Sequence, residues 1–499
     1  MMKRKILFAA LTGMFLSASL FALGRSEERP LRYALSGNPD TLDPHKTDGT
    51  LTFQVVKSVY DTLAEPDETG RIVPALAESW TVSADGRAWT FRLRRNVVFH
   101  DGTPFTSKDV KATLLRILDK AVASPRASEF TVISEIVIPD DHTVEIRLHT
   151  PSAPFLASLA SGWGAILPAS LIAAGHDFGS RPVGTGPFVF EEWIRDNKIS
   201  LKKNASYWMS GKPKLSGVEF RVITERAVQV QGRLSGQIDV VDLYDSVDVP
   251  ILEKNPDTKV QKNLTSLVMV MAMNASRPML NDPRVRQAIN HAVDKQKVLD
   301  IAYGGGVPVG TFMDHGDPYY RDFTKLYPYN PQRARQLLAH VEPGRTLEMV
   351  LPQNFEPHVR AGQLYQEMLA KVGLTVKIRL VDWSTWLADV HRGGNYDLTV
   401  IGHTGKLDPD NRLAGYGTER SYVRWVNLEA AKLIAEARTI VDPALRKTKY
   451  DRILEIMAKE APFVYTGTSY RYIGMRKNVE GFVMQPKLDA LDFRSARLK

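Results

Sequence analysis

The segment from Pro74 to Val110 limits the possible folds of this chain more strongly than any other part of it. Its Asp85-Gly86 dipeptide is a two-residue turn signal between two segments of alternating polarity. On the returning segment Trp89, Phe91 and Leu93 fall on one face of a strand, because side chains alternate between the two faces. The pattern therefore predicts a β-hairpin with one buried face.

A helix start follows this hairpin after one more turn. The turn signal is Asp101-Gly102, and Thr106 with Asp109 three residues later has the form of a capping box before an apolar helix. Further strands and helices of ordinary length alternate as far as residue 460. This alternation indicates an α/β protein built from layers of sheet and helix.

Length and composition are those of a globular protein. The chain has 499 residues, of which 43% are hydrophobic and 24% charged, and this length predicts two to four domains of about 100–200 residues each. The formal net charge is +9, but the basic residues are scattered among 56 acidic ones. A solvated surface explains this pattern better than a nucleic-acid site, so we expect no nucleic-acid partner.

The N-terminus has the pattern of a secretory signal peptide. Lys3, Arg4 and Lys5 precede an apolar run over residues 6–21, and small residues end it at 22–24. We therefore expect residues 1–24 to be removed, which takes away three positive charges and leaves +6. The alternative is a membrane anchor, but the run is shorter than the roughly 20 residues that span a bilayer.

The chain contains no cysteine. Disulfides, thiol catalysis and Cys-ligated metal sites are therefore excluded. A lipoprotein needs a Cys after its signal peptide, and Arg25 stands at that position. An exported chain without a lipid anchor is expected to be free in the periplasm.

Further motifs appear in a fixed order along the chain. They are the segment 182–193 (PVGTGPFVFEEW), Tyr207-Trp208, the helix start at 281–295 (NDPRVRQAINHAVDK) and 329–338 (YNPQRARQLL). Together with the segment 74–110, they resemble the family 5 extracytoplasmic solute-binding proteins, the peptide-binding group of ABC importers. The resemblance covers essentially the whole mature chain.

This resemblance implies a two-lobed periplasmic-binding-protein fold of type II, with mixed sheets flanked by helices. The N-terminal lobe would span residues 27–265, with an extra subdomain at about 48–180, and residues 479–499 would complete it. The C-terminal lobe would span residues 266–478. A hinged pair of lobes closes when a ligand contacts both of them.

The function implied is transport without chemical change. The protein would bind a peptide or dipeptide in the inter-lobe cleft as a monomer, without a cofactor, and deliver it to the transmembrane subunits of an ABC permease. An oligosaccharide, an opine-like compound or a metal chelate is the alternative ligand. A secreted hydrolase and a surface adhesin or chaperone-like binder are the alternatives outside transport.

The segment 402–411 (GHTGKLDPDN) is the main candidate for ligand contact. Dipeptide-binding members of the family have a similar segment in which a Trp lines the site and an Asp pairs with the ligand's amino group. This chain has His403 and Lys406 at those positions and retains Thr404, Gly405 and Asp408. Lys406 would repel an ammonium group, so an anionic or neutral polar ligand group fits better, unless the loop turns Lys406 towards solvent.

Other candidate contacts are aromatic residues and one turn. An Arg that peptide-binding relatives use for the ligand carboxylate has no counterpart in residues 352–358. Aromatic faces can stack on a ligand, although each could equally belong to the core. The remaining candidates are Trp163, Trp386, Trp425 and the turn residues Gly37 and Asn38.

No motif in the sequence indicates catalysis. The HExxH and GxSxG motifs are absent, and the phosphate-loop resemblance at 402–406 lacks its Ser/Thr and first Gly. The eleven His residues are dispersed without metal-ligand spacing, so we expect no metal site. The sequence thus predicts a binding protein and no enzyme.

Overall fold

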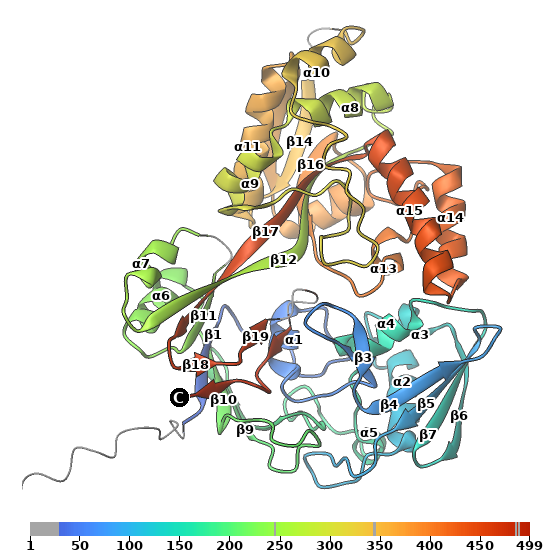
Figure 1. Cartoon of the computed structure of the whole chain (residues 1–499), viewed down its shortest axis with the longest axis vertical. Helices are drawn as coiled ribbons and strands as arrows, with labels where there is room; N and C mark the ends of the chain where they lie inside the picture. Colours follow the sequence, from blue (N-terminus) through green and yellow to red (C-terminus); the bar gives the residue numbers. More distant parts are fainter. Residues whose placement is uncertain (1–28, 244–245, 343–345, 485–486, 488–489) are drawn as a thin grey trace, which may run out of the picture.

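An eleven-stranded mixed sheet passes through both halves of the molecule. The computed structural model describes residues 29–243, 246–342, 346–484, 487 and 490–499, so the predicted signal peptide at 1–24 lies outside the described residues. The main path of the sheet has the order β15-β14-β16-β12-β17-β11-β1-β10-β9-β8, and β13 pairs with β17. Figure 1 shows two lobes joined by the long strands β12 and β17. The predicted two-lobed α/β fold is confirmed.

The first lobe holds one end of this sheet. β1 is parallel to both β10 and β11, and antiparallel β9 and β8 extend the edge. Leu31, Tyr33 and Leu35 of β1 belong to one buried core, and Ala34 faces another. The elements are β1 (Leu31–Leu35), α1 (Thr50–Val56), β2 (Ala64–Pro66), β3 (Ile72–Pro74), β8 (Phe188–Ile194), β9 (Lys198–Lys203), β10 (Gly217–Val222), α6 (Arg226–Leu234), β11 (Val240–Leu243) and α7 (Val249–Glu253).

The C-terminal tail packs into the core of the first lobe. Phe482, Leu491 and Phe493 are buried there, and the ring of Phe493 lies 5.9 Å from that of Tyr33. Its four short strands form two antiparallel pairs, β18–β21 and β19–β20. Their bounds are β18 (Val479–Glu480), β19 (Val483–Met484), β20 (Leu491–Asp492) and β21 (Arg497–Leu498).

The hairpin predicted at the start is part of a four-stranded antiparallel sheet with the order β4-β5-β7-β6. Trp89, Phe91 and Leu93 are buried in the core of this subdomain, as the alternation predicts. Asp109 accepts a hydrogen bond from the backbone N–H of Thr106 (2.7 Å), which confirms the capping box. The elements are β4 (Ala77–Val82), β5 (Ala88–Leu93), α2 (Ser107–Leu118), α3 (Ala127–Phe130), β6 (Ile133–Asp140), β7 (Thr143–Leu148), α4 (Phe155–Ala160), the 3₁₀ turn η1 (Gly162–Gly164) and α5 (Ala169–Ala173).

Two neighbouring strands, β12 (Thr258–Met273) and β17 (Phe463–Arg476), belong to both lobes. Their antiparallel register shifts between Leu264 and Val268. The predicted boundary at 265/266 falls on this irregularity, and the second, at 478/479, follows the end of β17. The boundaries themselves stay a prediction.

The second lobe buries β12 on both faces. Met269, Met271 and Met273 face one core, and Val268, Val270 and Ala272 face the other. Its elements are α8 (Pro283–Ala292), α9 (Lys295–Tyr303), β13 (Gly306–Val307), α10 (Pro331–Leu338), β14 (Thr346–Pro352), α11 (Glu356–Ala370), β15 (Thr375–Val381), α12 (Trp383–Thr385), the π-helical turn η2 (Trp386–Arg392), β16 (Leu398–His403), α13 (Asp410–Leu413), α14 (Leu428–Thr439) and α15 (Pro443–Glu460).

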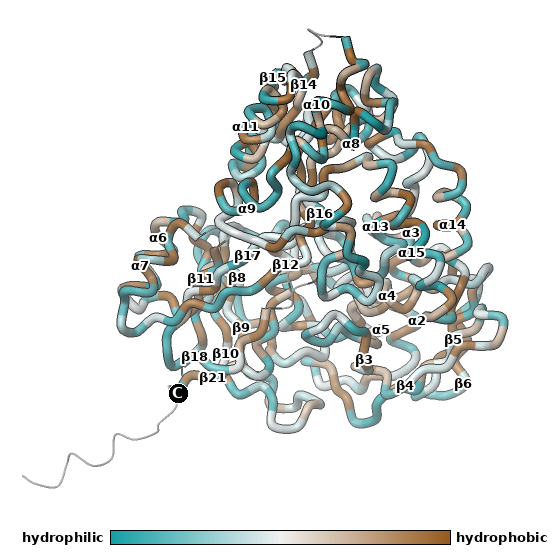
Figure 2. Tube along the Cα trace, turned by 45° about the horizontal axis from the view of Figure 1, so that its top comes forward, coloured by the Kyte–Doolittle hydropathy of each residue, from teal (hydrophilic) through white to brown (hydrophobic). Residues whose placement is uncertain are grey.

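Hydrophobic residues are spread over both lobes and do not form a single apolar band (Figure 2). Within the described ranges, no helix combines the length and the apolar character needed to cross a bilayer.

Two of the sequence motifs meet at one buried carboxylate, Asp61. Its oxygens accept hydrogen bonds from the hydroxyl of Thr185 (3.0 Å), the indole N–H of Trp208 (2.9 Å) and the hydroxyl of Tyr207 (3.3 Å). Gly184 lies so close to this segment that a Cβ there would be 2.3 Å from the carbonyl oxygen of Val59. The GTGP motif therefore has a role in packing. It allows the start of β8 to lie against α1 and the loop that follows α1.

We predict that Asp61→Ala lowers the free energy of unfolding by at least about 2 kcal/mol, because it leaves several buried donors without an acceptor. The control is Glu191→Ala, which removes a carboxylate whose side chain is 46% exposed and should change stability by less than about 0.5 kcal/mol. Urea unfolding followed by circular dichroism measures both. Equal stability of the two variants would contradict this role of Asp61.

Candidate functional site

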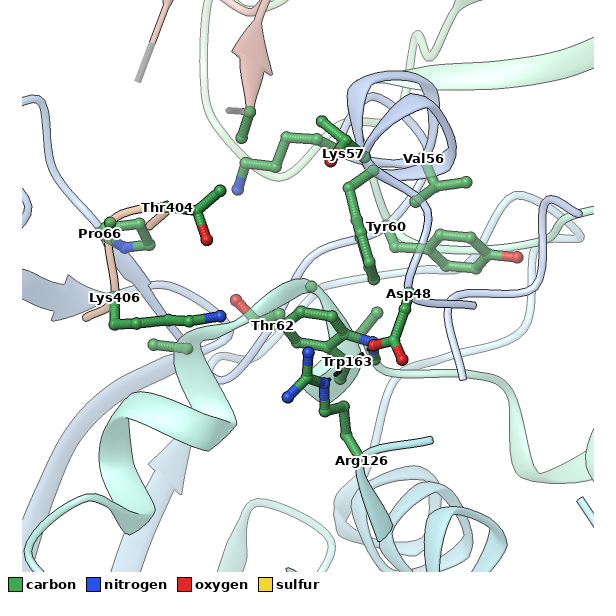
Figure 3. Close-up of a pocket in the computed structure, with 17 residues that line it drawn as sticks. Asp48, Val56, Lys57, Tyr60, Thr62, Pro66, Arg126, Trp163, Thr404 and Lys406 are labelled. Atoms are coloured by element: carbon green, nitrogen blue, oxygen red, sulfur yellow. Dashed lines mark hydrogen bonds and ion pairs between the residues drawn. The ribbon is translucent and has the colours of Figure 1, made fainter. Parts of the chain in front are cut away.

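A cavity of about 220 Å³ lies between the lobes, and both lobes contribute to its wall. The first lobe and its subdomain supply most of the lining, and the loop after β16 supplies the opposite side (Figure 3). The lining residues are Asp48, Thr50, Phe53, Val56, Lys57, Tyr60, Thr62, Pro66, Arg126, Ala160, Gly162, Trp163, Ala165, Thr404, Gly405, Lys406 and Ala490.

The lobes touch each other around this cavity. Lys487 of the tail pairs with Asp317 of the second lobe (3.0 Å). The backbone N–H of Ala153 donates to the carbonyl oxygen of Arg438 (2.9 Å) on the other side of the cleft. These contacts join the two lobes directly, and the cavity between them has walls from both.

Trp163 forms an aromatic wall that is fixed from three directions. Its indole N–H donates to the carbonyl oxygen of Thr47 (2.8 Å), and Phe53 packs edge-on against its ring at 4.7 Å. The guanidinium of Arg126 lies 4.6 Å from the ring centroid, within cation–π distance. Trp163 therefore presents a pre-positioned face to the cavity.

The cationic groups of the cavity differ in how they are paired. Lys57 pairs with Glu65 (2.6 Å), and Arg126 pairs with Asp48 (2.9 Å). Lys406 has no ion-pair partner among the described residues. Burial, and next the nearby positive charge of Arg126, lower the pKa of Lys406 below its usual value.

The loop that carries Lys406 is anchored to the sheet. A Cβ on Gly405 would lie 1.9 Å from the hydroxyl oxygen of Ser266, so only glycine allows this loop to cross β12 so closely. Arg412 donates to the carbonyl oxygens of Thr404, within the loop, and of Phe312, and so ties the loop to the segment that carries Phe312. These contacts direct Lys406 into the cavity, where Figure 3 shows its side chain pointing towards Thr62.

A second hollow of about 260 Å³ adjoins the cavity and shares Thr404 and Lys406 with it. His403 lines this hollow, and its imidazole lies 2.9 Å from the hydroxyl of Tyr422. Among the ten predicted contacts, the structure brings together around these two spaces Trp163, His403, Thr404, Gly405 and Lys406.

The other predicted contacts do not line either space. Trp386 is buried in the second lobe and donates to Thr399 (3.0 Å), and Trp425 donates to Glu460 (2.5 Å). Asn38, which follows Gly37 in the chain, donates a hydrogen bond to Asp196 (2.5 Å) in the turn between β8 and β9. These four residues lie outside the two spaces, and a ligand contact for them stays a prediction.

Asp408 is held in a buried ion pair within the second lobe. Its two oxygens accept hydrogen bonds from Arg446 on α15 at 2.5 and 2.7 Å, and both side chains are buried. This geometry fixes the base of the 402–411 loop.

Sequence reasoning missed Asp48, Lys57 and Arg126 as cavity residues. Arg126 lies just before α3, in a segment without periodicity, and Asp48 reaches the cavity because of its pairing with Arg126. Asp48 and Arg126 contact each other across 78 positions of sequence, so no local pattern could have indicated this pair.

Within the described ranges, no group of three or more His, Asp or Glu side chains could hold a metal ion.

A shared cavity between two lobes of this topology, with aromatic and charged walls, is the arrangement of an extracytoplasmic solute-binding protein.

Comparison with known proteins gives the family. The signature of the bacterial extracellular solute-binding proteins, family 5 (middle region), matches residues 71–422, and this chain belongs to that family. Members of the family are solute-binding components of ABC importers and lie outside the cytoplasm.

Individual relatives match along nearly the whole chain. The di/tripeptide-binding protein 2 of Pseudomonas aeruginosa (strain UCBPP-PA14) is 30% identical, over 97% of this chain and 98% of that protein. AgaA of A. tumefaciens R10, solved in complex with agropinic acid, has a TM-score of 0.77 at 30% identity, covering 94% of this chain and 99% of its own. DppA of Helicobacter pylori, solved with the peptide STSA, has a TM-score of 0.77 at 27% identity, covering 94% and 98%.

We predict that Asp408→Asn lowers the free energy of unfolding by about 3 kcal/mol or more, because it leaves the Arg446 charge buried without its partner. The control is Asp451→Asn on α15, the helix that carries Arg446. It breaks an i,i+4 pair with the partly exposed Lys447 and should lower the free energy of unfolding by less than about 0.5 kcal/mol. Denaturant unfolding measures both. A stable Asp408→Asn protein would show that the pair is not structural.

We predict that the protein loses stability as pH falls from about 6.5 towards 4. Burial lowers the pKa of His45, His100 and His358 to about 4 and that of His403 to about 3. In the unfolded chain these groups take up protons near pH 6.5, so their contribution is complete above that pH and is lost as pH falls. The melting temperature should drop by several degrees between pH 6.5 and 4.5, and an unchanged value would contradict this account.

Proposed function

We propose that this chain is the exported solute-binding component of an ABC importer and that it binds a short peptide between its lobes. The observation that carries the proposal is one cavity lined from both lobes in a chain that belongs to solute-binding family 5. A solute there contacts both lobes only in the closed form. Binding therefore favours closure, and closure gives the permease a surface that differs from the open one.

The size of the cavity supports a small solute. The cavity of about 220 Å³ and the adjoining hollow of about 260 Å³ are each smaller than the range of about 300–1,000 Å³ that holds drug-sized ligands. A dipeptide or tripeptide suits this space better than a long peptide. The di/tripeptide-binding relative from Pseudomonas aeruginosa has a name that agrees with this size class.

Export and release complete the proposal. Residues 1–24 act as a cleaved signal peptide, and a chain without cysteine carries no lipid on its N-terminus. The mature protein is free in the periplasm as a monomer and binds the transmembrane subunits of its permease. The solute leaves the site unchanged, since the protein's part is capture and delivery.

We predict saturable binding of at least one member of a panel of di- and tripeptides to the purified mature chain. Isothermal titration calorimetry measures the affinity, and the melting temperature should rise with ligand concentration. Trp163→Ala should weaken that binding about tenfold or more, because it removes the fixed aromatic wall.

The matched control is Trp383→Ala, which removes an exposed indole from the second lobe outside the cavity and should leave the affinity unchanged. Mass spectrometry of the solute before and after binding tests whether it is altered. Absence of saturable binding for every peptide, or catalytic turnover of a bound peptide, would contradict the proposed function.

A further inference from the structure

Lys406 places a half-buried ammonium in the cavity without a counter-charge that pairs with it. It lies on the loop after β16, and its side chain enters the cavity (Figure 3). No ion pair between Lys406 and a carboxylate occurs among the described residues. A charge that is partly removed from water and has no partner is destabilising, and an opposite charge beside it reduces that cost.

The carboxylates nearest to Lys406 are already bound to other groups. Asp48 accepts from Arg126 (2.9 Å), and Glu129 lies 3.6 Å from the same guanidinium. Glu129 also accepts a hydrogen bond from Ser158 (2.9 Å) and lies 3.5 Å from the side-chain amide of Asn411. Both carboxylates therefore have ion-pair or hydrogen-bond partners other than Lys406.

Arg126 and Lys406 come from opposite sides of the cleft and point into the same space. Two cations repel each other in a partly desolvated cavity. An anion placed between them attracts both, and these attractions outweigh the repulsion. Charge-assisted bonds from Lys or Arg to a carboxylate are among the stronger polar contacts in proteins.

We propose that the solute carries a carboxylate that binds the ammonium of Lys406, opposite Arg126, and that this group is required for tight binding in the closed form. The inference rests on the proposed function and adds the chemical class of its ligand. The carboxylate can be the C-terminus or acidic side chain of a short peptide, or the acid group of an opine-type N-carboxyalkyl amino acid. These sources share the chemistry and differ only in the rest of the molecule.

The experiment uses the mature chain and matched pairs of compounds. Each pair is a free acid and its amide: di- and tripeptides with C-terminal amides, peptides with Glu or Gln side chains, and N-carboxyalkyl amino acids with their amides. Calorimetry gives the dissociation constant for each. We expect a member of at least one pair to bind about tenfold or more tightly as the acid than as the amide.

The variants locate this preference in the cavity. Lys406→Gln should abolish the preference for the acid, and Lys406→Arg should keep most of it because the charge is retained. Lys432→Gln is the control, since it removes the same charge from a 78% exposed side chain of the same lobe and should leave the preference intact. Circular dichroism and the ligand-free melting temperature of each variant separate loss of binding from loss of folding.

Each outcome decides the inference. A preference for the acid that disappears only in Lys406→Gln supports it. Equal binding of acid and amide, or an unchanged preference in Lys406→Gln, overturns it while leaving the proposed function intact. If only N-carboxyalkyl amino acids bind, and their binding depends on Lys406, the proposal of a peptide ligand fails and the carboxylate inference stands. If no acid in the panel binds, the carboxylate inference is overturned.

Discussion

The antiparallel pairing of β12 with β17 is the constraint on which the rest of the structure depends. The pair runs from Thr258 opposite Arg476 to Ala272 opposite Phe463, and its two ends belong to different lobes. At one end β17 also pairs with β11 of the first lobe, and at the other β12 also pairs with β16 of the second. One hydrogen-bonded ladder therefore sets the relative position of the lobes, and its shift in register between Leu264 and Val268 marks where that ladder is least regular.

The placement of the site follows from this ladder. β16 pairs with β12 as far as His403 opposite Val268, so the loop that follows leaves the sheet beside the irregular point. The close approach of Gly405 to Ser266 keeps that loop against the strand. Lys406 therefore enters the space between the lobes because of backbone geometry, independently of any ligand. On the opposite wall Glu65 accepts hydrogen bonds from Lys57 (2.6 Å) and from Arg494 of the tail (2.7 Å), so the chain's last residues hold this side of the cavity.

Features that depend on neighbours in sequence could be predicted, and features that depend on distant residues could not. The β4–β5 hairpin and the capping box of α2 follow from alternation and spacing within a few residues. The sequence indicates a single helix start in the segment after Asn281, but the structure has two successive helices there, α8 and α9. The second helix begins at Asp294, whose side chain accepts a hydrogen bond from the backbone N–H of Lys297 (3.1 Å).

The candidate site divides in the same way. The 402–411 loop was identified because its resemblance to the family is local, and five of the ten expected residues do lie around the two spaces. The sequence around Trp386 and Trp425 does not distinguish a core tryptophan from one that stacks on a ligand. Only the structure, with their hydrogen bonds to Thr399 and Glu460, places them in the core. Arg126 had no signal of its own, because its role arises from Asp48 and Trp163, which are brought to it by the fold.

Lys406 also gives the cavity a means of rejecting the wrong solute. A ligand that places an ammonium or a neutral apolar group there leaves the half-buried Lys406 charge without compensation, and an ammonium adds repulsion from Arg126 on the other wall. Specificity is a difference between binding free energies, and an unpaired charge lowers the affinity for every solute that cannot neutralise it. Because the two cations lie on opposite lobes, this penalty is largest in the closed state. Under the proposed binding of a carboxylate, selection of the solute and closure of the lobes depend on the same pair of charges.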